Sequence, residues 1–273
     1  MKRMWSLPAV VWIGLITSTG WAAMKTQTVE YKQGGTTFKG YLAYDDAQTG
    51  KRPGVVVYPE WWGLTEYPQW RAQELAKLGY VAFVADMYGE GKTTTDAKQA
   101  AAWMTPIKQD RALMRARAQA ALEQLKAQPN VDGSKLAAIG YCFGGTTALE
   151  LARAGAPVLG IVSFHGNLDT PNPAADQIHA KILACTGGAD QFVSPKEVDA
   201  FKKEMQTTHA DWQMNVYGGA HHAFTNPKAD QFGIPNIAYN AEADHRSWAA
   251  MQLFFAEIFG TPPVVKPVSA QPQ

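Results

Sequence analysis

The feature that most constrains this chain is a glycine-flanked cysteine between an apolar run and a helix-forming run. Residues 140–145 read Gly-Tyr-Cys-Phe-Gly-Gly, directly after Leu136–Ile139 and before the helical stretch 147–152. Glycine permits a tight turn that larger side chains would block, and a strand, a reactive residue and a helix in this order describe a nucleophile elbow. The pattern predicts that Cys142 projects above a sheet, beside a helix N-terminus that favours an anion.

Strand-like apolar runs alternate with helical segments along the rest of the chain. This alternation predicts an α/β fold with a mostly parallel central sheet and helices on both faces. The expected strands are Thr37–Tyr44, Val55–Pro59, Val81–Asp86, Lys135–Tyr141, Gly160–His165, Lys181–Thr186 and Trp212–Tyr217. The expected helices are Tyr67–Leu78, Ile107–Ala127, Phe143–Ala154, Pro195–Met205 and Ala241–Phe259. There is no internal repeat or linker, so one domain over residues 25–260 is expected.

The two ends of the chain depart from this pattern. Residues 1–22 begin with Lys2 and Arg3, continue through an apolar stretch and end in small residues near Ala22, which is the pattern of a cleaved secretory signal peptide. The apolar stretch is shorter than the ~20 residues of a spanning helix. We therefore expect a periplasmic or secreted protein with no membrane span in its mature form. The proline-rich residues 261–273 predict a disordered tail.

Composition and cysteine content narrow the class of partner. The formal net charge is +1 and no dense basic run occurs, which argues against nucleic-acid binding. Export raises the possibility of a disulfide between Cys142 and Cys185. Cys185 lies in an apolar run, however, where a buried free thiol is common, so two free thiols are expected. No metal or organic cofactor is expected, because no set of residues has metal-ligand spacing, and the pattern leaves the oligomeric state open.

A cysteine nucleophile needs a base and a group that orients the base. Two later loops, each after an expected strand, offer these groups. The first carries Asp190, which is free to orient a base because Ser194 already fills the N-cap of the next helix. The second carries His221 and His222, and the local pattern does not choose between them. The order nucleophile, acid, histidine is that of the α/β-hydrolases.

At this point the chain resembles the dienelactone hydrolase family of α/β-hydrolases. Four motifs carry the resemblance, in family order and across nearly the whole mature chain: Pro59–Gly63, Gly140–Gly145, Gly187–Asp190 and His222–Phe224. The resemblance implies an α/β-hydrolase fold and a catalytic triad of Cys142, Asp190 and His222. It also matches Glu60 to an active-site glutamate that, in the family, pairs with the resting cysteine and moves when substrate arrives.

Other residues are expected to complete the site. The backbone N–H groups of Phe143 and Trp61 would form an oxyanion hole, because Phe143 follows the nucleophile and Trp61 lies on the loop after the second expected strand. Substrate-binding residues expected around them are Trp62, Tyr88, His165 and His221.

These residues imply hydrolysis of a small-molecule carboxylic ester or lactone through an acyl-enzyme. Members specific for dienelactone hold the substrate carboxylate with two arginines. The matching regions here, Asp86–Lys92 and Thr225–Pro227, contain no arginine, and lysine does not replace its bidentate fork. Acceptance of dienelactone itself is therefore an open question. Two other classes compete: a non-catalytic small-molecule-binding protein on the same fold, and a thiol-redox protein, for which no CxxC motif is present.

Overall fold

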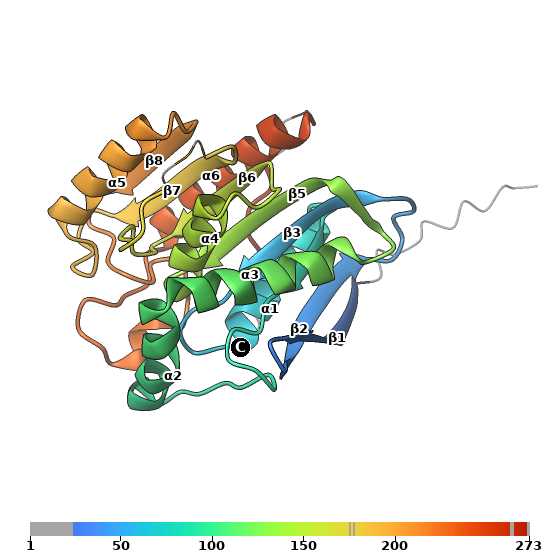
Figure 1. The fold of residues 1–273 in the computed structure, drawn as a ribbon, viewed down its shortest axis with the longest axis horizontal. Helices are drawn as coiled ribbons and strands as arrows, with labels where there is room; N and C mark the ends of the chain where they lie inside the picture. Colours follow the sequence, from blue (N-terminus) through green and yellow to red (C-terminus); the bar gives the residue numbers. More distant parts are fainter. Residues whose placement is uncertain (1–23, 175, 177, 263–264, 272–273) are drawn as a thin grey trace, which may run out of the picture.

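The computed structural model describes residues 24–174, 176, 178–262 and 265–271, and within them eight strands form one sheet (Figure 1). The strands are β1 (Met24–Gln33), β2 (Thr36–Asp45), β3 (Arg52–Tyr58), β4 (Val81–Val84), β5 (Val131–Tyr141), β6 (Gly160–Phe164), β7 (Lys181–Gly187) and β8 (Trp212–Tyr217). Their order across the sheet is β1-β2-β4-β3-β5-β6-β7-β8. The β1–β2 and β2–β4 pairs are antiparallel and every other pair is parallel. Loops after β3, β5, β7 and β8 therefore leave the same edge of the sheet.

Helices cover both faces of this sheet (Figure 1). Their bounds are α1 (Glu66–Lys77), α2 (Ala97–Gln109), α3 (Arg111–Lys126), α4 (Phe143–Arg153), α5 (Pro195–Thr207) and α6 (Ala241–Phe259), with a short 3-10 turn η1 (Ala229–Phe232). Val55 and Val57 of β3 pack with α1 and α6, whereas Val56 packs on the opposite face with α3 and α4. Successive strand residues point to opposite faces, so a continuous apolar run is what a strand buried on both sides requires. The predicted α/β class and the mostly parallel sheet are confirmed.

One strand, β1, was not predicted from the sequence. β1 pairs with β2 as a hairpin whose turn residues, Gly34 and Gly35, both have positive φ (56° and 80°). Two glycines between extended segments are a hairpin signal. Most side chains of β1 are exposed, however, so it lacks the apolar run that identified the other strands.

One predicted helix was wrong. The segment expected as a single helix, Ile107–Ala127, is divided between the end of α2 and α3. Asp110 ends α2 and caps α3, where its carboxylate accepts a hydrogen bond from the backbone N–H of Leu113 at 2.9 Å. Aspartate is a strong N-cap because it satisfies a helix N–H that has no intrahelical partner. The break turns α2 away from α3 and brings its last turn towards the edge of the sheet that carries the site (Figure 1).

Two further expectations concern the ends of the chain, the signal peptide and the C-terminal tail. Residues 1–22, the expected signal peptide, lie outside the described residues, so that expectation stays a prediction. The described part of the C-terminal tail contacts α1 and α6: Lys266 exchanges two backbone hydrogen bonds with the Gln252 side chain, and the N–H of Ser269 donates to Glu74. Within the described ranges, no helix is both long enough and apolar enough to cross a membrane.

Candidate active site

The elbow holds Cys142 in an unusual backbone conformation. Cys142 is the N-cap of α4 with φ 55° and ψ −119°. A non-glycine residue in such a region costs on the order of 1–3 kcal/mol, so it persists only where the surroundings enforce it. The glycines provide that enforcement by close packing. A Cβ on Gly144 would lie 2.0 Å from the carbonyl oxygen of Tyr58, and one on Gly140 would lie 1.9 Å from the carbonyl oxygen of Gly144.

Asp190 and His222 pair with each other, and His222 lines the same cavity as Cys142. Asp190 follows β7 and His222 follows β8, and His222 Nδ1 lies 3.0 Å from Asp190 Oδ2. The other Asp190 oxygen accepts the backbone N–H of Phe192 at 2.8 Å, which fixes the carboxylate. The His222 backbone is fixed in turn by hydrogen bonds with Asn236 and Ala238. With Nδ1 committed to Asp190, the remaining ring nitrogen is left for the thiol.

Electrostatics couple the same three groups. Burial is the largest single effect on His222 and would lower its pKa, but the negative charge of Cys142 opposes it. Together with hydrogen bonds to Asp190 and Cys142, this charge raises the pKa of His222 to about 10. A histidine that interacts with both a cysteine side chain and a carboxylate is the arrangement that activates a cysteine nucleophile.

Glu60 lies after β3 and faces the same cavity as Cys142. It is only 2 % exposed, and burial raises the pKa of its carboxyl to about 7, against smaller lowering effects of Asn226 and His222. Asn226 Nδ2 donates to Glu60 Oε2 at 2.8 Å. The partner of this buried carboxylate is therefore a neutral amide, which leaves the carboxyl able to take up a proton close to neutral pH.

The two N–H groups expected to bind an oxyanion have suitable surroundings. Phe143 is the first residue of α4, where backbone N–H groups have no intrahelical partner. Trp61 lies on the loop after β3, and its carbonyl oxygen accepts the Tyr88 hydroxyl at 2.8 Å. The Tyr88 ring also stacks on the Phe143 ring, with centroids 6.2 Å apart. Tyr88 thus contacts both residues from beneath.

A cavity of about 190 Å³ opens over Cys142, and most of its wall is apolar. Its polar lining residues are Glu60, Lys108, Cys142, Asn167 and His222. Its apolar lining residues are Trp61, Trp62, Met104, Phe143, Phe192, Ala223, Phe232, Ile234 and Ile237. Trp62, expected to contact substrate, is among them.

Three of the residues expected to bind substrate, Tyr88, His165 and His221, do not line the cavity. Tyr88 is buried beneath it and supports Trp61, as described above. His221 does not line the cavity, and its Nδ1 is buried without a hydrogen-bond partner in the described residues. His165 is 0 % exposed behind Cys142.

His165 holds the elbow from behind. Its Nδ1 accepts the backbone N–H of Cys142 at 3.0 Å, so the ring proton is on Nε2, which donates to Thr225 Oγ1 at 2.7 Å. Burial, followed by the charges of His222 and Arg71, lowers the pKa of His165 well below its ordinary value. His165 is therefore neutral, and it links the nucleophile backbone to the loop after His222.

The cavity also includes residues that the sequence pattern did not single out. Met104 and Lys108 are one helical turn apart on α2, and this spacing is a weak signal that one face of that helix lines a site. Asn167, Phe192 and Ile237 lie on loops whose approach to Cys142 depends on the tertiary fold.

The cysteines and carboxylates provide no second reactive or metal-binding centre among the described residues. Cys142 and Cys185 are both free in this structure. Burial raises the pKa of Cys185 to about 12, so its thiol is inert at neutral pH. Among the described residues, no group of three or more His, Cys, Asp or Glu side chains could hold a metal ion.

Comparison with known proteins identifies a family that the chain matches over most of its length. The family model described as "Dienelactone hydrolase family" matches residues 38–259. This range runs from β2 to the end of α6, so it contains every element that contributes to the cavity.

Individual relatives cover most of the chain. The crystal structure of a dienelactone hydrolase-like promiscuous phosphotriesterase from metagenomic libraries is 45% identical, covers 86% of this chain and 99% of that one, and has a TM-score of 0.84. The "Putative carboxymethylenebutenolidase" of Aquifex aeolicus is 30% identical over 79% of this chain and 94% of that protein. The "Probable 2-oxo-3-(5-oxofuran-2-ylidene)propanoate lactonase" of Bradyrhizobium is 30% identical over 74% of this chain and 86% of that protein.

Proposed function

Because this chain belongs to the dienelactone hydrolase family, we propose that it hydrolyses a carboxylic ester or lactone with Cys142 as nucleophile. The observation that carries this proposal is the position of His222, hydrogen-bonded to Asp190 through Nδ1 at 3.0 Å and charge-coupled to the thiol. A binding protein has no need for such an arrangement. It does have a direct use in acyl transfer, because it keeps a thiolate beside its proton donor.

The proposed reaction has two halves. The Cys142 thiolate attacks the ester carbonyl, and the oxyanion accepts hydrogen bonds from the N–H groups of Phe143 and Trp61. His222 then gives its proton to the leaving alkoxide as the C–O bond breaks, which leaves a thioester on Cys142. Neutral His222 next takes a proton from water, the hydroxide attacks the thioester, and the acid leaves as the thiolate and imidazolium re-form. Each oxyanion donor lowers the barrier of this reaction by about 3 kcal/mol.

Asp190 and Glu60 have separate roles in this scheme. Asp190 keeps the His222 ring oriented and stabilises its charged form. Glu60 faces the cavity, where a protonated carboxyl would not repel the thiolate and an ionised one would. We propose that the enzyme works with Glu60 protonated or turned away from Cys142.

The test is turnover of 4-nitrophenyl butyrate by purified wild-type protein, Cys142→Ala and Cys185→Ala. The Cys142→Ala variant should lose at least about a thousandfold in kcat, since it removes the nucleophile. Cys185→Ala, a change to the other thiol, should stay within about twofold of wild type. Iodoacetamide should alkylate Cys142 and leave Cys185 unmodified at neutral pH. Ester turnover that survives in Cys142→Ala would remove this residue from the mechanism. Selective alkylation with no ester turned over would favour the binding-protein alternative.

A second candidate activity comes from the 45% identical relative, which is described as a promiscuous phosphotriesterase. A phosphotriester also presents an electrophilic centre, a leaving alkoxide or phenoxide and an oxygen that becomes more negative during attack. The same thiolate and N–H groups could serve it. Turnover of a diethyl 4-nitrophenyl phosphotriester, lost in Cys142→Ala, would support this activity.

A further inference from the structure

The cavity over Cys142 contains one cationic side chain from α2, Lys108. Lys108 is half-buried in the last turn of that helix, and no other described residue lining the cavity is lysine or arginine. The walls around it are mainly aromatic and aliphatic. An ammonium at such a place interacts with an anion more strongly than it would in water, because the local dielectric constant is low.

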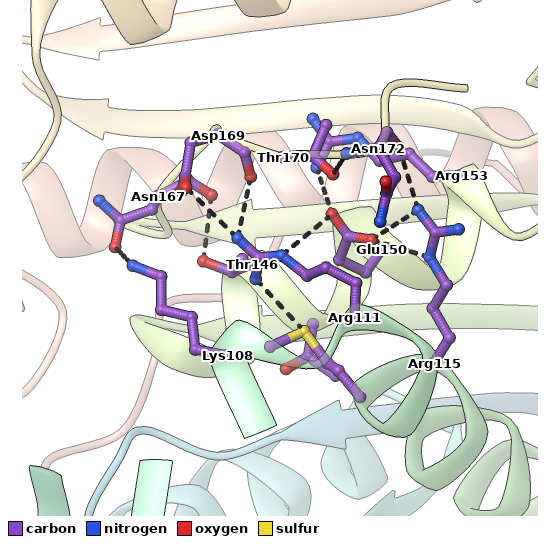
Figure 2. Close-up of polar contacts among 12 residues, drawn as sticks. Lys108, Arg111, Arg115, Thr146, Glu150, Arg153, Asn167, Asp169, Thr170 and Asn172 are labelled. Atoms are coloured by element: carbon purple, nitrogen blue, oxygen red, sulfur yellow. Dashed lines mark hydrogen bonds and ion pairs between the residues drawn. The ribbon is translucent and has the colours of Figure 1, made fainter. Parts of the chain in front are cut away.

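Asn167 holds this ammonium in position (Figure 2). Lys108 Nζ donates to Asn167 Oδ1 at 2.8 Å, and Asn167 Nδ2 donates to the carbonyl oxygen of Phe192. The second bond determines which end of the amide faces the lysine. An ammonium has three protons, so Asn167 uses one and others remain. Within the described ranges, no carboxylate oxygen lies within 4.0 Å of Lys108 Nζ.

Unlike Lys108, the neighbouring arginines form ion pairs with carboxylates. Arg115 pairs with the buried carboxylate of Glu150 at 2.7 Å, and Arg111 contacts both Glu150 and Asp169 (Figure 2). These charges serve the contact between α3 and α4, and removing one partner from a buried pair is strongly destabilising. Among the described residues, Lys108 has no carboxylate at ion-pair distance. The charge of Glu197 acts on it from farther away, so the ammonium keeps protons that a ligand can accept.

We propose that Lys108 is a specificity-determining residue that binds a carboxylate of the substrate. The preferred substrates would then be esters or lactones in which an apolar segment separates the reacting carbonyl from a negatively charged group. Lys108 also lines a neighbouring hollow together with Arg111 and Asp169. The charged end of such a substrate would therefore lie at a polar boundary, while its apolar segment fills the cavity over Cys142. This inference rests on the proposed function.

The test compares esters that differ only in charge. On the acyl side, the pair is the mono-4-nitrophenyl ester of adipic acid and 4-nitrophenyl hexanoate. On the alcohol side, the pair is 4-carboxyphenyl hexanoate and its neutral methyl ester. Wild type, Lys108→Met and Lys98→Met are assayed with each. Lys98→Met is the matched control, because Lys98 is exposed on the same helix and does not line the cavity.

The expected result is a selective loss. Lys108→Met should lower kcat/KM for the charged ester of one pair about ten- to hundredfold, mainly through KM, since a hydrogen-bonded charge pair is lost. Its effect on the neutral esters should stay within about twofold, and Lys98→Met should change neither. About 0.5 M KCl should reduce the wild-type preference, because salt screens a partly exposed charge pair.

Failure of this inference is distinguishable from failure of the proposed function. If the esters are hydrolysed but Lys108→Met affects charged and neutral members equally, or affects none, the role of Lys108 is overturned and the hydrolase proposal stands. If wild type hydrolyses none of them, the hydrolase proposal fails for these esters. Calorimetric binding of monomethyl adipate to Cys142→Ala then decides the role of Lys108. Binding that the added Lys108→Met change weakens supports it, and binding that is absent or unchanged overturns it.

Discussion

Two buried histidines lie side by side at this site, and one is cationic whereas the other is neutral. The rings of His165 and His222 are 5.3 Å apart. His222 faces a thiolate and a carboxylate, and these anions outweigh the cost of burying an imidazolium. His165 accepts a backbone N–H and faces the His222 cation, so both burial and its neighbour favour the neutral ring. The type of partner, rather than the depth of burial, decides the protonation of each ring.

The charge state of His222 should depend on Cys142. Replacing Cys142 with alanine removes the thiolate charge and one hydrogen bond, so the pKa of His222 should fall from about 10 towards or below its ordinary value. Nitrogen-15 NMR titration of the histidine side chains measures this directly. His165 should remain neutral, protonated on Nε2, from pH 5 to pH 9 in both proteins. A His222 resonance that titrates identically in wild type and Cys142→Ala would contradict the coupling.

Glu60 should make the folded protein less stable as the pH rises. Its pKa is near 4.5 in an unfolded chain and about 7 in the folded one. Between these values the folded state keeps a proton that the unfolded state has released, so the free energy of unfolding decreases with rising pH, and the penalty is complete above pH 7. Glu60→Gln should therefore stabilise the protein at pH 8 by about 3 kcal/mol. It should have little effect at pH 4, where both states are protonated.

Urea denaturation of wild type and Glu60→Gln at the two pH values checks this sign. Glu66→Gln is a suitable control, because Glu66 is an exposed acid on the nearby first turn of α1. A stabilisation by Glu60→Gln that is equal at pH 4 and pH 8 would show that ionisation of Glu60 is not its source.

At the scale of elements, the site depends on the close approach of α4 to β3. The elbow runs so near the end of β3 that no side chain fits at Gly144. This contact sets the distance between the loop that carries Glu60 and Trp61 and the helix N-terminus that carries Cys142 and Phe143. The same packing therefore places both expected oxyanion donors.

Gly144→Ala tests that approach. Its added methyl group would meet backbone oxygens that cannot rotate away, so we expect loss of several kcal/mol of stability or failure to accumulate as folded protein. Gly218→Ala is the matched change, because a Cβ there meets nothing within 4 Å; its thermal midpoint should lie near that of wild type. Soluble Gly144→Ala protein with an unchanged midpoint would contradict the packing argument.

At the scale of the whole molecule, local sequence patterns predicted the features that are set by short stretches of the chain. The elbow, the parallel strands and the loops of Asp190 and His222 each follow from a short stretch of residues, and the fold class follows from their alternation. The position of Lys108 could not be predicted in this way, because it depends on a helix break at Asp110 and on how α2 then packs. The contact between His165 and the Cys142 backbone depends on the pairing of β5 with β6, which no local pattern reveals.

The last prediction concerns export of the whole protein and removal of its N-terminal segment. If residues 1–22 are a signal peptide, expression with the complete chain in a Gram-negative host should give a periplasmic protein whose intact mass corresponds to cleavage near Ala22. Removal of Lys2 and Arg3 would change the formal net charge from +1 to −1. The measurement is mass spectrometry of osmotic-shock fractions, with a chain lacking residues 2–22 as the control. Full-length mass in the cytoplasm alone would refute the assignment.

The order of the site residues along the chain has a consequence for biosynthesis. Glu60 and Cys142 leave the ribosome first, Asp190 follows, and His222 emerges only after the last strand of the sheet. A nascent chain therefore carries the Cys142 thiol before it carries the imidazole that we propose as its base, so the proposed site is complete only when translation is nearly finished. A premature stop between α4 and β8 would leave a fragment that contains Cys142 but lacks His222.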